Sequence, residues 1–407
     1  MLALAAVALL ALAPMAMAQS EYDPYEPTNP HDEGGGRDSV IGSENRPARV
    51  RQISGGRYEY VVIGPAAEAV AAAAAITDAG GTITRSNDLG GLGQRSQIAT
   101  FPGAAAYEAA LAAIARLAPQ SSLGPQHLYN FAQAFGGRAP RLYAPALIGD
   151  AAPGRCHLAR PITIGMIDGP INTDHPALRG VDVTYETVVP RGRVPAADHG
   201  TGVAALLVGE DESGALAGFA RGARLYAVSV FSSSDLGEEA SVELIAEALD
   251  RLVRGGVRLI NMSIAGPENA ALARAITAAA QHGAVLVAAS GNNRRAEVAW
   301  PAAAPEVIAV TAVDAARRRF YLANTGAQLE FAAPGVDVYA ARGNGGGYVS
   351  GTSFAAPIVT ALAARQMAAG AGSTEAIRAR LRATVEALGP GQRNTDFGWG
   401  LVQAHGC

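Results

Sequence analysis

The stretch Thr163-Ile164-Gly165-Met166-Ile167-Asp168 is a short apolar run that ends in an aspartate. Apolar runs of this length are typical of strands that are buried on both faces of a parallel sheet. Further runs of the same kind lie at Arg224–Phe231, Val257–Met262, Ala284–Ala289 and Val307–Val313. Helices are expected at Gly200–Val208, Ala240–Arg254, Ala270–His282 and Ser353–Ala369. This alternation predicts right-handed βαβ units, and hence an α/β fold with a mainly parallel sheet that carries helices on both faces.

From residue 57 to residue 131 the pattern is that of a small α+β domain. Strands are expected at Tyr58–Ile63, Gly81–Ser86, Gln97–Phe101 and His127–Phe131, and helices at Pro65–Ala79 and Ala104–Leu117. The resulting order, β-α-β-β-α-β, is the split βαβ pattern of ferredoxin-like domains. Because such modules bind many kinds of ligand and protein, the order alone assigns no function.

The remaining segments divide the chain by composition. Residues 1–18 are uncharged and apolar and end in Ala-Met-Ala, which predicts a secretory signal peptide with an A-x-A cleavage site. We expect a flexible acidic leader at residues 19–56, a connector rich in Gly, Pro, Ala and Arg at residues 132–160, and the large domain at residues 161–407. No later stretch reaches the roughly 18 apolar residues of a transmembrane helix. The sequence therefore predicts an exported protein, periplasmic or extracellular.

The charge of the chain is small and localised. The formal net charge is −4, and the seven acidic residues and three arginines between residues 19 and 50 account for all of it. The balanced remainder gives no electrostatic reason to expect a nucleic-acid partner. The sequence also contains no lysine, so all 32 basic residues are arginine. This excludes a P-loop, a Ser-Lys dyad and a Schiff-base lysine.

The two cysteines, Cys156 and Cys407, allow two interpretations. In an oxidising compartment they could pair as a disulfide. Alternatively they are two unpaired thiols, since the sequence gives no distance between them. The absence of any CxxC spacing argues against a metal site or a redox motif.

Polar residues stand at three of the expected strand ends and helix starts. Asp168 follows the first apolar run, His199 opens a helix in Asp-His-Gly-Thr-Gly, and Ser353 opens another in Gly-Thr-Ser-Phe-Ala-Ala-Pro. A serine hydroxyl needs a base to remove its proton, and that base needs a carboxylate to fix its tautomer. At the carboxyl edge of one parallel sheet the three could converge for this purpose. Each alone is more commonly structural: a turn aspartate, a packed histidine or a turn serine.

In the order Asp, His, Ser, the three segments together resemble the subtilisin-like serine peptidases, the subtilases. The resemblance extends from Pro161 to Ala404 and includes three more segments: Ile260-Asn261-Met262-Ser263, Ala288-Ala289-Ser290-Gly291-Asn292 and Phe397-Gly398-Trp399-Gly400-Leu401-Val402-Gln403-Ala404. It implies a subtilisin-like domain that hydrolyses peptide bonds through an acyl-enzyme. By pattern and position, residues 57–131 resemble the inhibitory propeptide of that family.

The resemblance also implies roles for particular residues. Ser353 would be the nucleophile, His199 the general base and acid, and Asp168 the residue that orients the imidazole. The side-chain amide of Asn292 and the backbone N–H of Ser353 would stabilise the oxyanion. The implied substrate-binding residues are Ser263, Ile264, Ala265, Ala289, Ser290 and Gly291, with Ala299 near the base of an uncharged first specificity pocket.

Other positions concern selectivity and departures from the family pattern. Glu238 and Glu239 could lie beside the extended substrate and favour basic residues farther from the cut. Gly169-Pro170 follows the aspartate where the family usually has Ser/Thr-Gly, so a supporting hydrogen bond to Asp168 is expected to be missing.

One acidic segment raises the question of calcium. Glu210-Asp211-Glu212-Ser213 falls where many subtilases fold a calcium loop, and carboxylates suit Ca²⁺. Ala177, however, stands where the family often has a ligand aspartate. We expect no required cofactor, and a solvated acidic loop is the alternative to a calcium site.

The sequence thus predicts an exported serine endopeptidase with polypeptide substrates, made as a precursor whose N-terminal domain is an intramolecular inhibitor. We expect His127–Phe131 to lie in or near the active cleft and the enzyme to cut itself between about residues 131 and 160, in the exposed connector. The alternatives are a permanent accessory domain, a catalytically inactive subtilase-fold binding protein, and an esterase or acyl transferase that uses the same triad. The presence of all four catalytic candidates argues against the inactive protein.

Overall fold

The computed structural model describes residues 49–53, 57–131, 142–150, 157–158, 160–190, 194–211, 214–234 and 237–404. All of these residues belong to one compact unit, Val40–Cys407. The predicted signal peptide, Cys156 and Cys407 lie outside the described residues, so both interpretations of the cysteines stay open. The division of the chain into a small and a large domain also stays a prediction.

A seven-stranded sheet forms the centre of residues 160–404. In sheet order its strands are β15 (Leu329–Pro334), β14 (Val307–Val313), β13 (Val285–Ala289), β11 (Leu259–Met262), β6 (Thr163–Asp168), β8 (Arg224–Ser229) and β7 (Val183–Thr187). Every neighbouring pair is parallel. The α/β fold expected from the sequence is confirmed, and the five apolar runs are the five inner strands.

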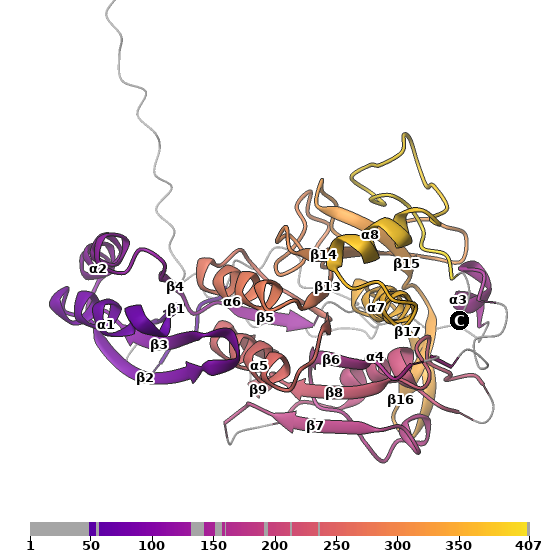
Figure 1. The fold of residues 1–407 in the computed structure, drawn as a ribbon, viewed down its shortest axis with the longest axis horizontal. Coiled ribbons are helices and arrows are strands. Elements are labelled where there is room, and N and C mark those ends of the chain that lie inside the picture. Colours follow the sequence, from indigo (N-terminus) through magenta and orange to yellow (C-terminus); the bar gives the residue numbers. More distant parts are fainter. Residues whose placement is uncertain are drawn as a thin grey trace, which may run out of the picture. The chain divides into compact units, whose positions relative to one another are not determined.

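Helices cover both faces of this sheet (Figure 1). One face carries α4 (Asp198–Val208) and α7 (Thr352–Ala368), and the other carries α5 (Val242–Arg254) and α6 (Ala270–Gln281). Along β13, Val285 and Val287 belong to the buried cluster that contains α7, whereas Leu286 and Ala288 belong to the cluster of α5 and α6. Because successive residues of a strand point to opposite faces, a continuous apolar run fills both cores.

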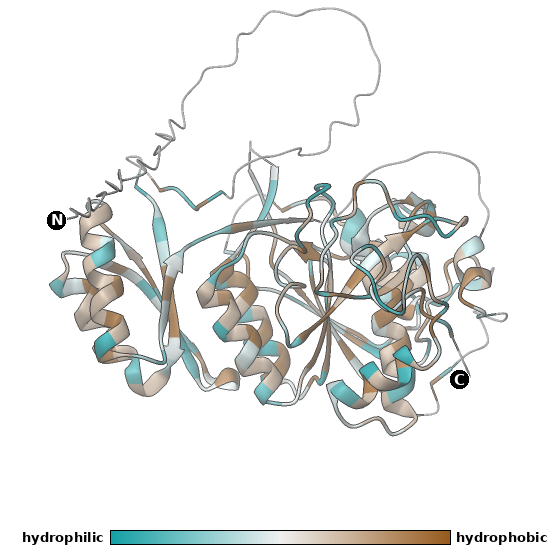
Figure 2. Cartoon of the chain, turned by 90° about the horizontal axis from the view of Figure 1, so that it is seen from above, coloured by the Kyte–Doolittle hydropathy of each residue, from teal (hydrophilic) through white to brown (hydrophobic). Residues whose placement is uncertain are grey.

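Hydropathy follows this layering (Figure 2). The strands of the parallel sheet are hydrophobic along their length, whereas hydrophilic residues lie on outward faces of the helices. The helix α7 differs, because every residue from Thr352 to Arg365 is buried. A helix that is enclosed on all sides belongs to the core of a domain. The first turn of α7, which contains Ser353, is therefore held rigidly.

A second sheet, within residues 59–125, forms what we call the N-terminal module together with its helices. Its strands are antiparallel, in the order β2 (Thr82–Leu89), β3 (Gln94–Thr100), β1 (Glu59–Pro65) and β4 (Ser122–Pro125). Its helical elements are η1 (Ala66–Glu68), α1 (Ala69–Asp78), η2 (Gly90–Leu92) and α2 (Ala104–Leu117). The expectation that His127–Phe131 completes this sheet was wrong, because β4 takes that place. With four residues that include a glycine and a proline, β4 gives no apolar run in the sequence.

The strand β5 (Leu128–Phe131) joins a different sheet. That sheet has the order β12 (Ile264–Ala265), β5, β10 (Gly237–Ser241) and β9 (Ser232–Ser234). Leu128 lies opposite Ser241 of β10, and Asn130 lies opposite Ala265 of β12, both in antiparallel register. Pro125, which has no N–H for a further ladder bond, ends β4. The chain thus leaves the N-terminal module and passes between two strands contributed by residues 237–265.

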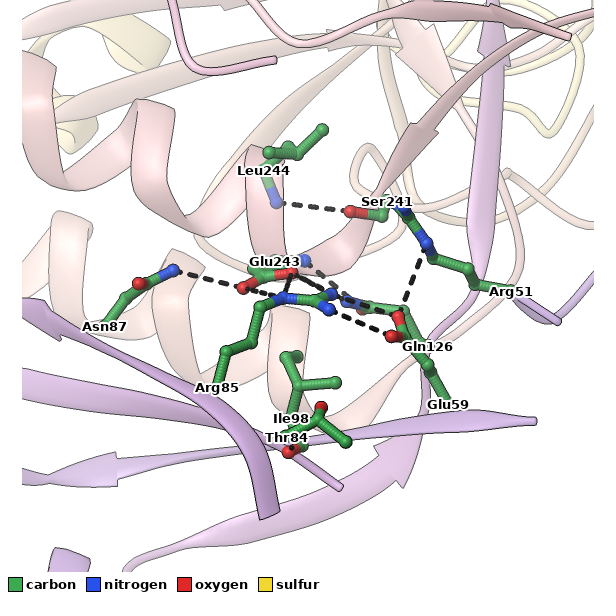
Figure 3. A network of polar contacts seen from close by, with 10 residues as sticks. All are labelled: Arg51, Glu59, Thr84, Arg85, Asn87, Ile98, Gln126, Ser241, Glu243 and Leu244. Atoms are coloured by element: carbon green, nitrogen blue, oxygen red, sulfur yellow. Dashed lines mark hydrogen bonds and ion pairs between the residues drawn. The ribbon is translucent and has the colours of Figure 1, made fainter. Parts of the chain in front are cut away.

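Polar side chains connect the N-terminal module to α5 (Figure 3). The carboxylate of Glu243, in the first turn of α5, is buried and accepts hydrogen bonds from Arg85 (Nε, 2.8 Å), Asn87 (3.0 Å) and Gln126 (3.4 Å). Arg85 also donates to Glu59 through Nη1 at 2.9 Å. These polar contacts lie beside a buried apolar cluster that also spans the two parts and includes Val61, Ile63 and Leu92 of the module.

Two segments expected to lack regular structure contain ordered elements. In the predicted leader, Val50 forms a β-bridge with His127 and Gln52 one with Tyr58. In the predicted connector, α3 (Tyr143–Leu147) is a short helix followed by the fully buried Ile148. For these described parts the expectation of a flexible leader and an exposed connector was wrong. None of the described helices is both long and apolar enough to cross a membrane.

Besides the sheets and helices already named, the described part of residues 160–404 contains three further elements. They are η4 (Pro176–Leu178), the hairpin of β16 (Val338–Arg342) with β17 (Gly345–Val349), and α8 (Thr374–Arg382).

A buried ion pair fixes the segment after α3 to α7. The carboxylate of Asp150 accepts a hydrogen bond from Nη2 of Arg365 at 2.7 Å, and both residues are less than a tenth exposed. Arg365 also donates through Nε to the carbonyl oxygen of Phe219 at 2.8 Å. The hydroxyl of Tyr143 donates to the carbonyl oxygen of Val336 at 2.6 Å. Residues 142–150 are therefore attached to the parallel-sheet part.

We predict that Asp150→Ala lowers the free energy of unfolding by about 3–5 kcal/mol, because it leaves the Arg365 guanidinium buried without its counter-charge. Asp182→Ala is the matched control: its partner Arg224 is 3.1 Å away, but both side chains are more than half exposed. That change should cost less than about 1 kcal/mol. Urea unfolding of the two variants measures the difference, and equal losses would contradict the structural role given to Asp150.

Candidate active site

The carboxylate of Asp168 and the imidazole of His199 meet at the carboxyl edge of the parallel sheet. Asp168 is the last residue of β6, and His199 lies in the first turn of α4. Oδ1 of Asp168 lies 2.7 Å from Nδ1 of His199 and also accepts the backbone N–H of Gly169 at 2.7 Å. Asp168 is fully buried and His199 is 4% exposed. A buried carboxylate at this distance fixes the ring and its tautomer.

The second carboxylate oxygen of Asp168, Oδ2, is where the sequence predicts that a supporting hydrogen bond is missing. Oδ2 is buried, and among the described residues it has no hydrogen-bond partner. Gly169, which stands where a hydroxyl residue was expected to assist, contributes only its backbone N–H. The Gly169 N–H supports only Oδ1, the oxygen that also faces His199, so no described residue supports Oδ2.

Close packing beneath His199 explains the glycine that follows it. A Cβ atom at Gly200 would lie 2.4 Å from the carbonyl oxygen of Pro170, so only glycine lets α4 begin this close to the segment after Asp168. The ring of Phe354 lies beneath His199, with 5.3 Å between ring centroids. Because Phe354 belongs to α7, this contact joins the histidine to the helix that carries Ser353.

Ser353 is the second residue of α7 and is fully buried. Its carbonyl oxygen accepts a hydrogen bond from the hydroxyl of Ser263 at 2.8 Å. Ser263 in turn accepts a bond from the amide of Asn261, at the end of β11 (3.0 Å). The start of α7 is thus held against the segment that leads into β12. The sequence indicated Ser263 as a substrate-binding residue but gave no sign of this contact.

The side chain of Asn292 has one defined orientation. Its oxygen accepts the backbone N–H of Thr352 at 3.2 Å and the Thr352 hydroxyl at 3.0 Å. Because an N–H can only donate, the amide nitrogen must point the other way. That nitrogen is buried and makes no hydrogen bond within the part of the chain that the structure describes. This buried amide donor therefore lies beside the start of α7, which carries Ser353. Thr352 was not singled out in the sequence, and its place beside Ser353 is the signal that could have found it.

The expected substrate-binding residues come from two segments, residues 263–265 and residues 289–291. Ile264 and Ala265 form β12 and pair with β5. Ser290 follows β13, and its carbonyl oxygen accepts the N–H of Ala299 at 2.9 Å. Gly291 has φ +93°, and a Cβ there would lie 2.9 Å from Cβ of Ala299. Ser290 and Gly291 therefore lie beside Ala299, the expected base of the pocket.

The two glutamates of β10 have different neighbours: Glu238 lies near His199, and Glu239 pairs with Arg49 of the predicted leader. Burial raises the pKa of the Glu238 carboxyl above its usual range; the nearby His199 and a hydrogen bond from the Ala196 backbone oppose this, and Asp168 adds to it. Glu239 forms an ion pair with Arg49. Its pKa is also raised by burial, against the lowering effects of Arg49 and Arg51. The two carboxylates thus lie along β10, the strand that pairs with β5.

The predicted calcium loop is only partly described. The carboxylate of Asp211 accepts the N–H of Leu216 at 3.2 Å, and Glu210 lies 3.8 Å from Arg221. The carbonyl oxygen of Ala177 accepts the N–H of Glu210 at 2.7 Å. Over the described ranges, no cluster of three or more His, Cys, Asp or Glu residues could hold a metal ion. The described residues of this loop do not fit a calcium site.

Comparison with known proteins places these features in a family. The model of the subtilase family matches residues 159–400. Subtilisin DY of Bacillus licheniformis is 32% identical over 248 residues, which cover 59% of this chain and 88% of that protein. Subtilisin E of Bacillus subtilis is 31% identical over 286 residues, 67% of this chain and 71% of the relative.

Solved structures give the same result. The protease domain of PatA matches with a TM-score of 0.53 and 27% identity, over 60% of this chain and 92% of the other. The prenylagaramide maturation protease PagA matches with a TM-score of 0.54 and 27% identity, over 64% of this chain and 96% of that protein. The matched family region contains the parallel sheet, Asp168, His199, Asn292 and Ser353. The chain therefore belongs to the subtilase family and is a serine endopeptidase.

Proposed function

We propose that Ser353, His199 and Asp168 form the catalytic triad of this endopeptidase. The observation that carries the proposal is the buried Asp168–His199 pair at 2.7 Å, beside the helix that begins at Thr352. With Nδ1 of His199 donating to Asp168, Nε2 is the nitrogen that takes the proton from the Ser353 hydroxyl. In the same step Oγ of Ser353 bonds to the carbonyl carbon of the substrate.

The oxyanion that forms on the carbonyl oxygen needs donors that are already in place. The Asn292 amide nitrogen and the Ser353 backbone N–H meet this requirement, and the start of α7 adds the partial positive charge of a helix N-terminus. His199 then gives its proton to the leaving amine as the C–N bond breaks. Water hydrolyses the acyl-enzyme with the same base.

We also propose that the enzyme is exported and made as a precursor that its N-terminal module inhibits. The support is the position of β5, which lies between β10 and β12 where an extended substrate would pair with both. The contacts of Glu243 with Arg85, Asn87 and Gln126, beside a shared apolar cluster, hold the module against α5 before the cut. Self-cleavage beyond β5 would release it.

The first prediction concerns the nucleophile. Wild-type enzyme should react covalently with a fluorophosphonate probe at Ser353, and Ser353→Ala should lose the label while keeping its circular dichroism spectrum. His199→Ala should lose about as much activity as Ser353→Ala, because triad residues act as a unit. Ser263→Ala is the control for the neighbouring serine, and it should keep the covalent label. Labelling of Ser353→Ala equal to that of wild type would refute the assignment of Ser353 as the nucleophile.

The second prediction concerns Asn292. Asn292→Ala should lower kcat by about 10²–10³-fold with a much smaller change in KM, a magnitude taken from the corresponding donor in a subtilisin rather than derived for this chain. Thr352→Val should have a smaller effect in the same direction, because it removes one of the two bonds that orient the amide. Steady-state kinetics on a peptide substrate separates kcat from KM. A purely KM effect of Asn292→Ala would contradict the oxyanion role.

The third prediction concerns processing. Wild-type protein should become shorter by more than about a hundred residues through a cut between about residues 131 and 160. Ser353→Ala should accumulate at the longer, signal-cleaved length under the same expression conditions. Mass spectrometry of the two proteins gives the lengths. A wild type that hydrolyses casein at full precursor length would show that the module is a permanent accessory domain.

A further inference from the structure

Residues 49–53, which we call the leader segment, precede the N-terminal module in the chain but lie beside the start of β5. Val50 forms an antiparallel bridge with His127. The Leu128 N–H donates to the carbonyl oxygen of Arg49 at 2.8 Å. The leader segment therefore pairs with the stretch where the chain leaves the module and enters β5.

The leader segment and β10 hold this stretch from opposite sides. The carbonyl oxygen of His127 accepts the N–H of Val242, the residue after β10, at 3.2 Å. Because successive peptide groups of an extended chain point in opposite directions, the Leu128 N–H points away from β10 and toward the leader segment. The strand β12 pairs farther along β5, at Asn130 and Phe131. At Leu128 the leader segment therefore takes the place that β12 has farther along β5.

The side chain of Arg49 extends to β10, although its backbone pairs with Leu128. It forms an ion pair with Glu239, and the two side chains are only 22% and 12% exposed. Burial raises the pKa of the Glu239 carboxyl, whereas Arg49 and Arg51 lower it. A largely buried carboxylate that loses its partner is left with an uncompensated charge. One residue of the leader segment thus connects the start of β5 to β10.

Arg51 connects the leader segment to the module itself (Figure 3). Its carbonyl oxygen accepts the N–H of Glu59 at 2.8 Å, and its Nε lies 3.4 Å from the carboxylate of Glu59. That carboxylate also accepts a hydrogen bond from Arg85, which in turn binds Glu243 of α5. The leader segment thus joins the module, β5 and the peptidase part at one place.

We propose that the leader segment is a latch that keeps β5 paired with β10, so that the inhibitor consists of residues 49–53 together with the N-terminal module. The inference rests on the proposed function, which takes β5 as the inhibitory strand. After a cut beyond β5, non-covalent contacts alone hold the module to the enzyme. The Arg49–Glu239 pair is one of those contacts and lies on β10 itself, so it slows the departure of the cut module.

The first test uses the uncut Ser353→Ala precursor. Adding Arg49→Ala should speed hydrogen–deuterium exchange of the Val242 N–H, which bonds to the start of β5, by about tenfold. Glu239→Gln keeps the size of the side chain and removes its charge, so it should have a similar effect. The double variant should add little to either change, because both break the same ion pair. Arg116→Ala, at an exposed position in the last turn of α2, is the matched control and should change the exchange by less than about twofold.

The outcomes separate this inference from the proposed function. Unchanged Val242 exchange in both Arg49→Ala and Glu239→Gln would overturn the latch. Exchange in the Ser353→Ala precursor that is already as fast as in processed wild type would instead contradict the inhibitory position of β5.

The second test follows the enzyme after the cut. Native mass spectrometry of freshly processed protein should find the cut module bound to at least about threefold less of Arg49→Ala than of Arg116→Ala. Equal amounts of bound module would overturn the latch. A wild type that is never cut would contradict the proposed processing instead, and the exchange test on the precursor would still decide the inference.

Discussion

The antiparallel pairing of β5 with β10 and β12 is the interaction on which the arrangement of this protein depends. Beyond this pairing, the N-terminal module contacts the parallel-sheet part through a shared buried apolar cluster, which includes Val61 and Leu92, and through polar side chains such as the Arg85–Glu243 pair. Through the pairing, one extended strand passes beside the segment that holds Ser353. Under the proposed function, an extended substrate would use the same backbone donors and acceptors of β10 and β12 that now pair with β5.

The parallel sheet brings the candidate catalytic residues together beside β5. Because β6, β11 and β13 run in the same direction, the residues after them meet at one edge of the sheet. Asp168, Ser263 and Asn292 all follow these strands. Two helices complete the site, α4 with His199 and α7 with Ser353. The contact of Phe354 with His199 ties these helices to each other.

The sequence predicts the inner part of this structure well, for a physical reason. Strands buried on both faces are apolar throughout, and the five inner strands were found on that basis. The edge strand β7 was not, because its residues are mostly half-exposed, and β15 was not, because Glu330 interrupts its apolar run. The four-residue β4 gave no periodic signal, so β5 was assigned to the wrong sheet.

The candidate site was predictable in its residues but not in its supports. Motif order at strand ends and helix starts predicts Asp168, His199 and Ser353, and the resemblance to the subtilases adds Asn292. The orientation of Asn292 by Thr352 and the burial of Tyr129 against Gly266 depend on segments distant in the chain. No pattern within one segment reports such contacts, so only the folded structure reveals them.

Hydrogen–deuterium exchange at Val242 tests most directly whether β5 occupies the substrate position. The Val242 N–H donates to the carbonyl oxygen of His127, whereas the Gly266 N–H donates to Trp300 within the peptidase part. Exchange at Val242 should be slow in the Ser353→Ala precursor and at least about tenfold faster in the processed wild-type enzyme, with Gly266 protected in both. Equal protection of Val242 in the two proteins would contradict the account.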